Sequence, residues 1–165
     1  MVTTRTTSAA ELLAMGSDAP YELIQGELVS VSPASQKSNL VLNYINWELY
    51  GFVRANALGR VFVAEAGFLV AVNPDTVVAP DIAFVARGRL PEPIPNEGFA
   101  EVVPDLIVEV ISPSDEPGDL RRKQAIYDRV MVPLVWWIDP IKETATIHLH
   151  GQPVTRQDRT GMLDF

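Results

Sequence analysis

Apolar residues recur along the chain with two different periods, which predict helices alternating with strands. Between residues 38 and 56 they return every three or four positions, as on one face of an amphipathic helix that ends at Gly59. Two almost wholly apolar runs, residues 106–111 (LIVEVI) and 134–138 (LVWWI), predict strands buried on both faces. A second helix is expected over residues 119–130. The pattern therefore predicts an α/β domain with a central mixed β-sheet flanked by helices.

Shorter segments complete the predicted order of elements. Ser8 and Glu11 have the spacing of a capping box and predict a short helix over residues 8–15. The turn Gly26-Glu27 predicts a hairpin of two short strands. Further strands are expected at residues 60–64 and 68–72, as a hairpin around Gly67, at 77–85, with the strand proper starting beside Asp81 because of Pro80, and at 144–149. The proline-rich residues 88–98 form a loop that is a candidate for a mobile segment over a site, and a stiff surface connection is the alternative.

Composition narrows the classes of protein. The 165 residues fit a single domain over residues 1–165, with about the first seven expected to be disordered. There is no cysteine, which excludes thiol chemistry and zinc–thiolate sites. No apolar run approaches the roughly 20 residues of a membrane-spanning helix, so we expect a cytoplasmic protein without membrane contact. The net charge of −8 argues against tight, unspecific binding to DNA and is compatible with carboxylates gathered around a metal.

Two acidic residues are the first candidates for chemistry. Glu109 lies inside an apolar strand, where burial of an unpaired carboxylate costs several kcal/mol. It needs a cation, a hydrogen-bonding cage or a proton, and a salt bridge in the core is the alternative to a functional role. Asp81 follows Pro80, where aspartate also serves turn chemistry. If the two strands are neighbours, both carboxylates meet at one end of the sheet and suit Mg²⁺ or Mn²⁺.

A possible cation for this site lies on the helix that follows the strand of Glu109. Lys123 and Tyr127 are spaced i, i+4 on that helix. Lys123 fits a charge aimed at a phosphate or at an attacking water, although a solvated helix face is the alternative. Arg121 and Arg122 add a small basic edge or solvate the helix.

Other motifs offer less. His148 and His150 alternate on the last predicted strand without a third ligand nearby, and Trp136-Trp137 suits core packing better than base stacking. The chain contains no phosphate-binding loop of the GxxxxGK[ST] type, no GxGxxG and no GxSxG.

Taken together, these segments resemble the Uma-two family of predicted bacterial endonucleases, which belongs to the restriction-endonuclease-like, PD-(D/E)-x-K superfamily. PDLIVEVISPSD is the most distinctive segment, and the match spans roughly residues 20 to 150 in the order of the family. The matching pieces are YELIQGELVSVSP (21–33), APDIAFV (79–85), PDLIVEVISPSD (104–115), the Lys123–Tyr127 pair and VPLVWWIDP (132–140).

The resemblance implies a restriction-endonuclease-like fold and a Mg²⁺-dependent (or Mn²⁺-dependent) endonuclease acting on DNA. Asp81 and Glu109 would be catalytic and metal-binding, the backbone carbonyl of Val110 would complete the metal shell, and Glu27 would be an additional acidic residue near the site. Ile111 occupies the usual position of the catalytic lysine, which Lys123 would supply from the following helix. Double-strand cleavage favours a homodimer.

The chain also departs from the family pattern. SPASQKSNL lacks the histidine that many relatives have after the Ser-Pro pair, Val78-Ala79 stand where many have a basic residue, and residues 151–165 hold little further strand material. A second hypothesis therefore stays open, namely a catalytically degenerate nuclease fold that serves as a binding or oligomerisation module.

Overall fold

A six-stranded mixed sheet forms the centre of the computed structural model, which describes residues 6–16, 19–31, 33–63 and 66–158. Its strand order is β10-β9-β8-β7-β6-β3. Neighbouring strands are antiparallel except β7 and β8, whose parallel pairing is made by the crossover through α3. The strands are β3 (Gly59–Val63), β6 (Ile82–Ala86), β7 (Leu106–Val110), β8 (Leu134–Asp139), β9 (Thr144–Leu149) and β10 (Thr155–Asp158).

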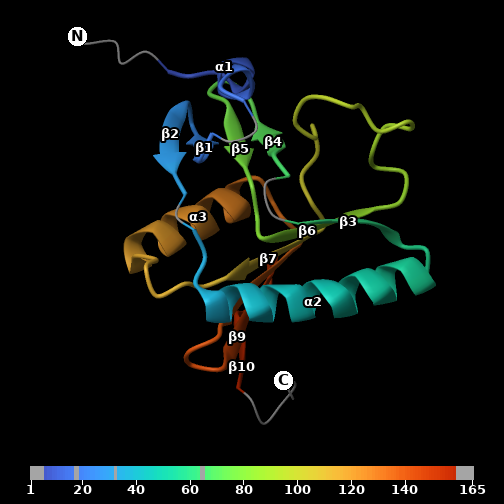
Figure 1. Cartoon of the computed structure of the whole chain (residues 1–165), viewed down its shortest axis with the longest axis vertical. Coiled ribbons are helices and arrows are strands. Elements are labelled where there is room, and N and C mark those ends of the chain that lie inside the picture. Colours follow the sequence, from blue (N-terminus) through green and yellow to red (C-terminus); the bar gives the residue numbers. More distant parts are fainter. Residues whose placement is uncertain (1–5, 17–18, 32, 64–65, 159–165) are drawn as a thin grey trace.

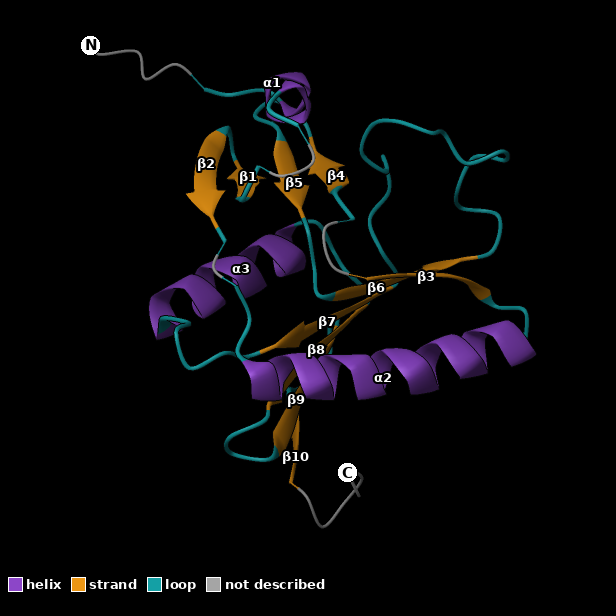
Figure 2. Cartoon of the chain, in the orientation of Figure 1, coloured by secondary structure: helices purple, strands orange, loops and turns teal. Residues whose placement is uncertain are grey.

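A second, four-stranded antiparallel sheet lies beside the first, with the order β2-β1-β5-β4. Three helices complete the fold (Figures 1 and 2). The strands of this sheet are β1 (Tyr21–Ile24), β2 (Glu27–Ser30), β4 (Phe68–Ala71) and β5 (Thr76–Val78), and the helices are α1 (Ala9–Ala14), α2 (Gln36–Ala55) and α3 (Pro117–Arg129).

Three apolar clusters hold these elements together in layers. On one face of the six-stranded sheet, α2 packs through Leu42 and Ile45. The other face packs against α3 and the small sheet through a larger cluster that includes Ile107 and Val135. The short helix α1 covers the outer side of the small sheet through Leu12. The small sheet and α3 therefore share one side of the central sheet, as Figure 1 shows.

The alternation of side chains along β7 decides which side receives the candidate glutamate. Val108 and Val110 belong to the cluster under α2, and Ile107 belongs to the cluster on the opposite face. Because successive side chains of a strand point to opposite faces, Glu109 points with Ile107 toward α3 and the small sheet.

Most of the elements predicted from the pattern are present. The capping box of α1 forms as expected, with the Ser8 side chain accepting from the Glu11 N–H. The first hairpin is β1–β2, and α2 starts at Gln36, two residues before the predicted position, because the Ser35 side chain caps it. The expected disorder of the first seven residues falls mainly on residues 1–5, which lie outside the described part, whereas the Thr7 N–H donates to the carbonyl of Gly26.

Two predictions were wrong, one on a strand pairing and one on the C-terminal segment. β3 and β4 do not form a hairpin, because β3 pairs with β6 in the large sheet and β4 pairs with β5 in the small one. The expected break at Pro80 and the strand start beside Asp81 are confirmed by β6, although the residues before Pro80 form a separate strand, β5, in the other sheet. β10 adds strand structure near the C-terminal end that the sequence did not suggest.

The helix was expected to end at Gly59, but Gly59 does not end α2. The helix ends at Ala55, and Ala57 takes the positive φ. Gly59 instead begins β3 against β6, where an added Cβ would lie 2.1 Å from the carbonyl oxygen of Val85. Its lack of a side chain thus permits the close approach of two strands. Among the described helices, none is long and apolar enough to cross a bilayer.

Gly59→Ala is expected to lower the free energy of unfolding by about 1–3 kcal/mol, because the backbone of β6 must move to admit the methyl group. The matched control is Gly118→Ala in α3, where an added Cβ meets nothing within 4 Å. That change should be neutral or stabilise by about 0.5 kcal/mol through helix propensity. Urea unfolding measures both variants, and equal effects would contradict the close packing at Gly59.

Candidate active site

Asp81 and Glu109 are brought side by side by the pairing of β6 and β7. The register joins Ile82 to Val108, so the next position of the ladder places Asp81 opposite Glu109. The Val110 N–H donates to Asp81 Oδ2 at 2.7 Å, which fixes the aspartate at the end of β7. Both carboxylates therefore lie on the same face and at the same end of the sheet, the arrangement that the sequence reading required.

Glu109 is buried, and two groups from α3 meet its Oε1. Its residue exposure is 6%. The Tyr127 hydroxyl donates to Oε1, and Lys123 Nζ lies 3.0 Å from the same atom. Lys123 and Tyr127 reach it together because residues spaced i, i+4 share one face of a helix. The helix after β7 thus supplies the cation that sequence reasoning expected.

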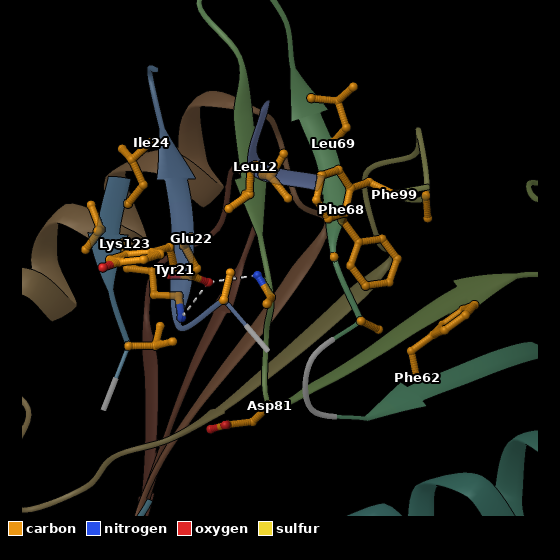
Figure 3. A pocket seen from close by; sticks show the side chains of 18 of the residues that line it. Leu12, Tyr21, Glu22, Ile24, Phe62, Phe68, Leu69, Asp81, Phe99 and Lys123 are labelled. Atoms are coloured by element: carbon orange, nitrogen blue, oxygen red, sulfur yellow. Dashed lines mark hydrogen bonds and ion pairs between the residues drawn. The ribbon is translucent and has the colours of Figure 1, made fainter. Parts of the chain in front are cut away.

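A second buried carboxylate, which the sequence reading missed, belongs to Glu22 on β1. It is 4% exposed, and its Oε1 lies 3.2 Å from Lys123 Nζ. The same oxygen accepts the N–H of Ala79 at 2.8 Å, as the dashed lines in Figure 3 show. The sequence signal that could have found Glu22 is the one that singled out Glu109, namely a carboxylate within a strand. Only the packing of the small sheet on α3 shows that Glu22 is buried.

Glu27 does not join this cluster. It lies on the edge strand β2, where its side chain is 67% exposed and its Oε2 lies 2.6 Å from Arg122 Nη2. Glu22 therefore takes the place that had been expected of Glu27. Both glutamates lie on the face of the hairpin that carries Ile24, because Ile24 pairs with Glu27. They differ because Glu22 belongs to the inner strand β1 and Glu27 to the edge strand β2.

Trp137 forms the next wall of the site. It pairs with Glu109 in the register of β7 and β8, and its ring centroid lies 6.4 Å from that of Tyr127. Its indole N–H donates to Gln124 Oε1 at 2.6 Å, which ties the residue beside Lys123 to the sheet. Trp137 is thus a buried packing residue, as the sequence suggested for the tryptophan pair.

The segment after β7 is held by the first turn of α2. The Ser38 hydroxyl donates to the carbonyl of Ile111, and the Ser35 N–H donates to Ser112 Oγ. Asp115 accepts the Ser112 N–H at 2.7 Å and closes the turn that follows. The N-terminal end of α2 therefore lies at the site end of β7, and its anchoring fixes the backbone beyond Glu109.

An open cleft between the two sheets leads to these groups. Glu22, Asp81, Glu109 and Lys123 all line it. Figure 3 shows Lys123 beside Glu22 at one wall, with Asp81 on the opposite, central-sheet side. Residues 89–91 and 94–98 of the proline-rich segment line the same cleft, as expected of a segment near a site.

Burial and charge act in opposite directions on the carboxyl groups. Burial raises the pKa of Glu109 to about 7, although Lys123 and the Tyr127 hydroxyl favour the carboxylate. Burial also raises the pKa of Asp81, and the negative charges of Asp115 and Glu22 add to this effect against the Val110 N–H and Lys123. The neighbouring positive charge and hydrogen-bond donors therefore do not fully offset the effects of burial and of the nearby negative charges on these two carboxyl groups.

Lys123 shows the reverse balance. Burial disfavours its ammonium form, but the carboxylates of Glu109 and Glu22 outweigh that effect and hold its pKa above the usual range. Tyr127 stays neutral because burial and the neighbouring carboxylates raise the pKa of its hydroxyl well above 10. Lys123 is thus a fixed cation and Tyr127 a fixed hydrogen-bond donor.

The donor set fits a small divalent cation in its chemistry. Within the described residues, Asp81 Oδ1 and Glu109 Oε2 accept no hydrogen bond, whereas the second oxygen of each carboxylate is used. Carboxylate oxygens and a backbone carbonyl, as at Val110, are the ligands that Mg²⁺ prefers. Over the part of the chain that the structure describes, no three His, Cys, Asp or Glu side chains are grouped as a metal site.

Lys123→Met is expected to lower the free energy of unfolding of the metal-free protein by about 3 kcal/mol at pH 8, because it leaves two buried carboxylates without their cation. Arg121→Met, on the exposed part of the same helix, should change it by less than about 0.5 kcal/mol. Urea unfolding in the presence of a chelator compares them. Equal losses would contradict the bridging role of Lys123.

The raised pKa of Glu109 predicts a pH dependence of the metal-free protein. The carboxyl ionises near 4.5 in the unfolded chain and at about 7 in the folded one, so folding favours the protonated form. The contribution of Glu109 to the free energy of unfolding is largest below pH 4.5 and falls as the pH rises to 7. Above pH 7 it is lost, a decrease of up to about 3 kcal/mol.

Glu109→Gln should remove this dependence. The free energy of unfolding of the variant minus that of wild type should be larger at pH 8 than at pH 5.5. Urea unfolding with a chelator at both pH values measures this difference. The same difference at both pH values would contradict a raised pKa at Glu109.

Comparison with known proteins bears on the fold and the family of the chain. No curated protein sequence matches the chain significantly. Among solved structures, a putative nuclease belonging to DUF820 from Anabaena variabilis ATCC 29413 shares the fold with a TM-score of 0.76 and 19% identity, over 94% of this chain and 87% of that one. The expected restriction-endonuclease-like α/β fold is thereby confirmed. The Uma2 family model, described as "Putative restriction endonuclease", matches residues 9–164, and the chain therefore belongs to the Uma2 family.

Proposed function

We propose that the chain is a Mg²⁺-dependent (or Mn²⁺-dependent) endonuclease that hydrolyses phosphodiester bonds of DNA. Membership of a family described as restriction endonucleases supports a nuclease. The observation that carries the finer proposal is the pairing of Asp81 with Glu109 at the end of two adjacent strands, with Lys123 Nζ 3.0 Å from Glu109. Two acidic ligands and one cation at a single point suit phosphoryl chemistry.

Asp81, Glu109 and the carbonyl of Val110 would hold the metal ion. Such an ion supplies a Lewis acid for a phosphate oxygen and lowers the pKa of a bound water. It also offsets the shortage of positive charge that burial and mutual repulsion create at the two carboxyl groups. The same charge lets a protein of net charge −8 accept a polyanion at this place.

Lys123 would act as an electrostatic group and not as a base. Its contacts with Glu109 and Glu22 keep it in the ammonium form, which has no lone pair to accept a proton. A fixed ammonium beside the metal ligands can bind a phosphate oxygen and stabilise the charge that develops there. Glu22 then serves as a positioning residue, because it touches Lys123 and the backbone of Ala79.

The second candidate function is a nuclease fold that binds or assembles without cleaving. Two observations favour it: Lys123 already balances two buried carboxylates as a structural ion pair would, and the described residues hold no cluster of three metal-ligating side chains. The two functions differ in one measurable property, the metal-dependent cleavage of DNA.

Cleavage of supercoiled plasmid and of single-stranded DNA is expected in Mg²⁺ or Mn²⁺ and not in a chelator. Asp81→Asn and Glu109→Gln should each lower the rate at least about 100-fold, because each removes one charged ligand. The matched control is Glu92→Gln, an exposed glutamate whose side chain is 82% exposed and contacts only Arg60 among the described residues. It should cleave at the wild-type rate.

Circular dichroism verifies that each variant is folded, and calorimetry with Mn²⁺ measures binding directly. Metal-dependent cleavage that all three variants retain would place the active site elsewhere. Absence of cleavage in wild type, together with Mn²⁺ binding that Glu109→Gln leaves unchanged, would favour the binding module.

A further inference from the structure

The long helix α2 is apolar on the side that faces away from the central sheet. Its inner side buries Leu42, Ile45 and Val53 against the sheet. Large hydrophobic side chains also stand in solvent, so the helix is apolar on more than its core face. They are Leu40 (71% exposed), Tyr44 (45%), Trp47 (76%), Tyr50 (50%) and Phe52 (61%). Exposed aromatic residues gathered in this way are typical of an interaction surface.

The exposed positions follow the spacing of a coiled-coil seam. Exposed residues recur at alternating steps of three and four along nearly the whole helix, which is the a/d repeat of two packed helices. They are Lys37, Leu40, Tyr44, Trp47, Gly51 and Arg54. The outermost positions are charged, but the central ones carry Leu40, Tyr44 and Trp47, where a solvated helix would have polar residues.

We propose that this outer face of α2 packs antiparallel against the same face of a second copy of the chain, around a two-fold axis between Tyr44 and Trp47. In that arrangement Tyr44 faces Trp47 of the second copy, and Leu40 faces its Gly51. An added Cβ on Gly51 would meet nothing within 4 Å, so this position offers a hollow for the leucine. The seam is thus complementary to itself, as a two-fold interface requires.

The available surface approaches what a stable dimer needs. Aromatic side chains bury about 150–250 Å² each. At their exposures, Tyr44, Trp47 and the flanking Tyr50 present about 250–430 Å² per copy, and Leu40 adds to it. A standard interface covers about 800 Å² per partner, which the flanking polar residues of the helix complete.

Charge opposes the association at the ends of the seam and through the net charge of each copy. Lys37 would lie near Arg54 of the second copy, and each chain carries a net charge of −8. Both lysine and arginine are exposed and can turn into solvent. The apolar centre around Trp47 therefore has to carry the binding, which makes this residue the best point for a test.

The arrangement has a consequence for the candidate active site. α2 covers one face of the central sheet and the cleft opens on the other, so the two clefts of the dimer would face away from each other. The N-terminal end of α2 lies at the site, and antiparallel pairing puts the two sites at opposite ends of helices about 30 Å long. Two such sites would act independently and not on both strands of one short duplex segment. The dimer proposal itself does not depend on nuclease activity.

The first experiment is sedimentation of the full-length chain from about 1 to 100 µM. Wild type should associate to two copies, and Trp47→Glu should weaken the association at least about 30-fold, because a charge then replaces the central aromatic side chain. Ile141→Glu is the matched control, since Ile141 is 64% exposed in the turn after β8 and should leave association unchanged. Circular dichroism verifies that both variants are folded.

Disulfide trapping tests the register. The chain has no cysteine, so only introduced thiols can pair. Leu40→Cys with Gly51→Cys should give a covalent dimer on oxidation, and Leu40→Cys alone should not. Within one helix these positions are about 16 Å apart, too far for a disulfide inside one chain.

Three results would overturn the proposal. They are a wild-type chain that stays monomeric over the whole concentration range, a dimer that Ile141→Glu weakens but Trp47→Glu does not, and a dimer that is lost only when residues 159–165 are removed. Trapping by the double cysteine variant together with loss of association in Trp47→Glu would support it.

Discussion

The ion pairs of Lys123 join the three parts of the molecule that build the site. Its ammonium lies between Glu109 of the central sheet and Glu22 of the small sheet, and the residue itself belongs to α3. Three charged groups buried together are stable only if each has its partner. The relative position of the two sheets and α3 is thus coupled to the charge balance of one cleft. A shift of any one of these three parts would break an ion pair of Lys123.

The same cluster is the physical basis of the proposed metal site. Lys123 supplies one positive charge against the carboxylates of Glu22, Glu109 and Asp81, and burial raises the pKa of the last two. An oxygen of Asp81 and one of Glu109 remain unused among the described contacts, because the Val110 N–H, Tyr127 and Lys123 take the others. Structure and charge thus lead to the same property, a demand for positive charge at the end of β6 and β7.

The fold divides two tasks between the faces of the central sheet. One face carries the cleft, and α2 covers the other with an apolar layer toward the sheet and a second apolar side toward solvent. The first turn of α2 touches the segment after β7 through Ser35 and Ser38. Any group that packs on the outside of α2 would therefore be joined mechanically to the end of the strand that carries Glu109.

The sequence by itself determined the type and order of most elements, because the period of apolar residues depends only on local geometry. It also identified Asp81, Glu109 and Lys123, since a carboxylate in an apolar strand needs a partner and an i, i+4 pair on the next helix can offer one. It could not choose between strand partners, so β3 and β4 were joined wrongly and the separate strand β5 before Pro80 was not foreseen. Only the tertiary structure decided that Glu22 and not Glu27 meets Lys123. Both lie on the same face of the hairpin, but Glu22 belongs to the inner strand β1, whereas Glu27 belongs to the edge strand β2 and contacts Arg122 instead, and this packing on α3 is non-local.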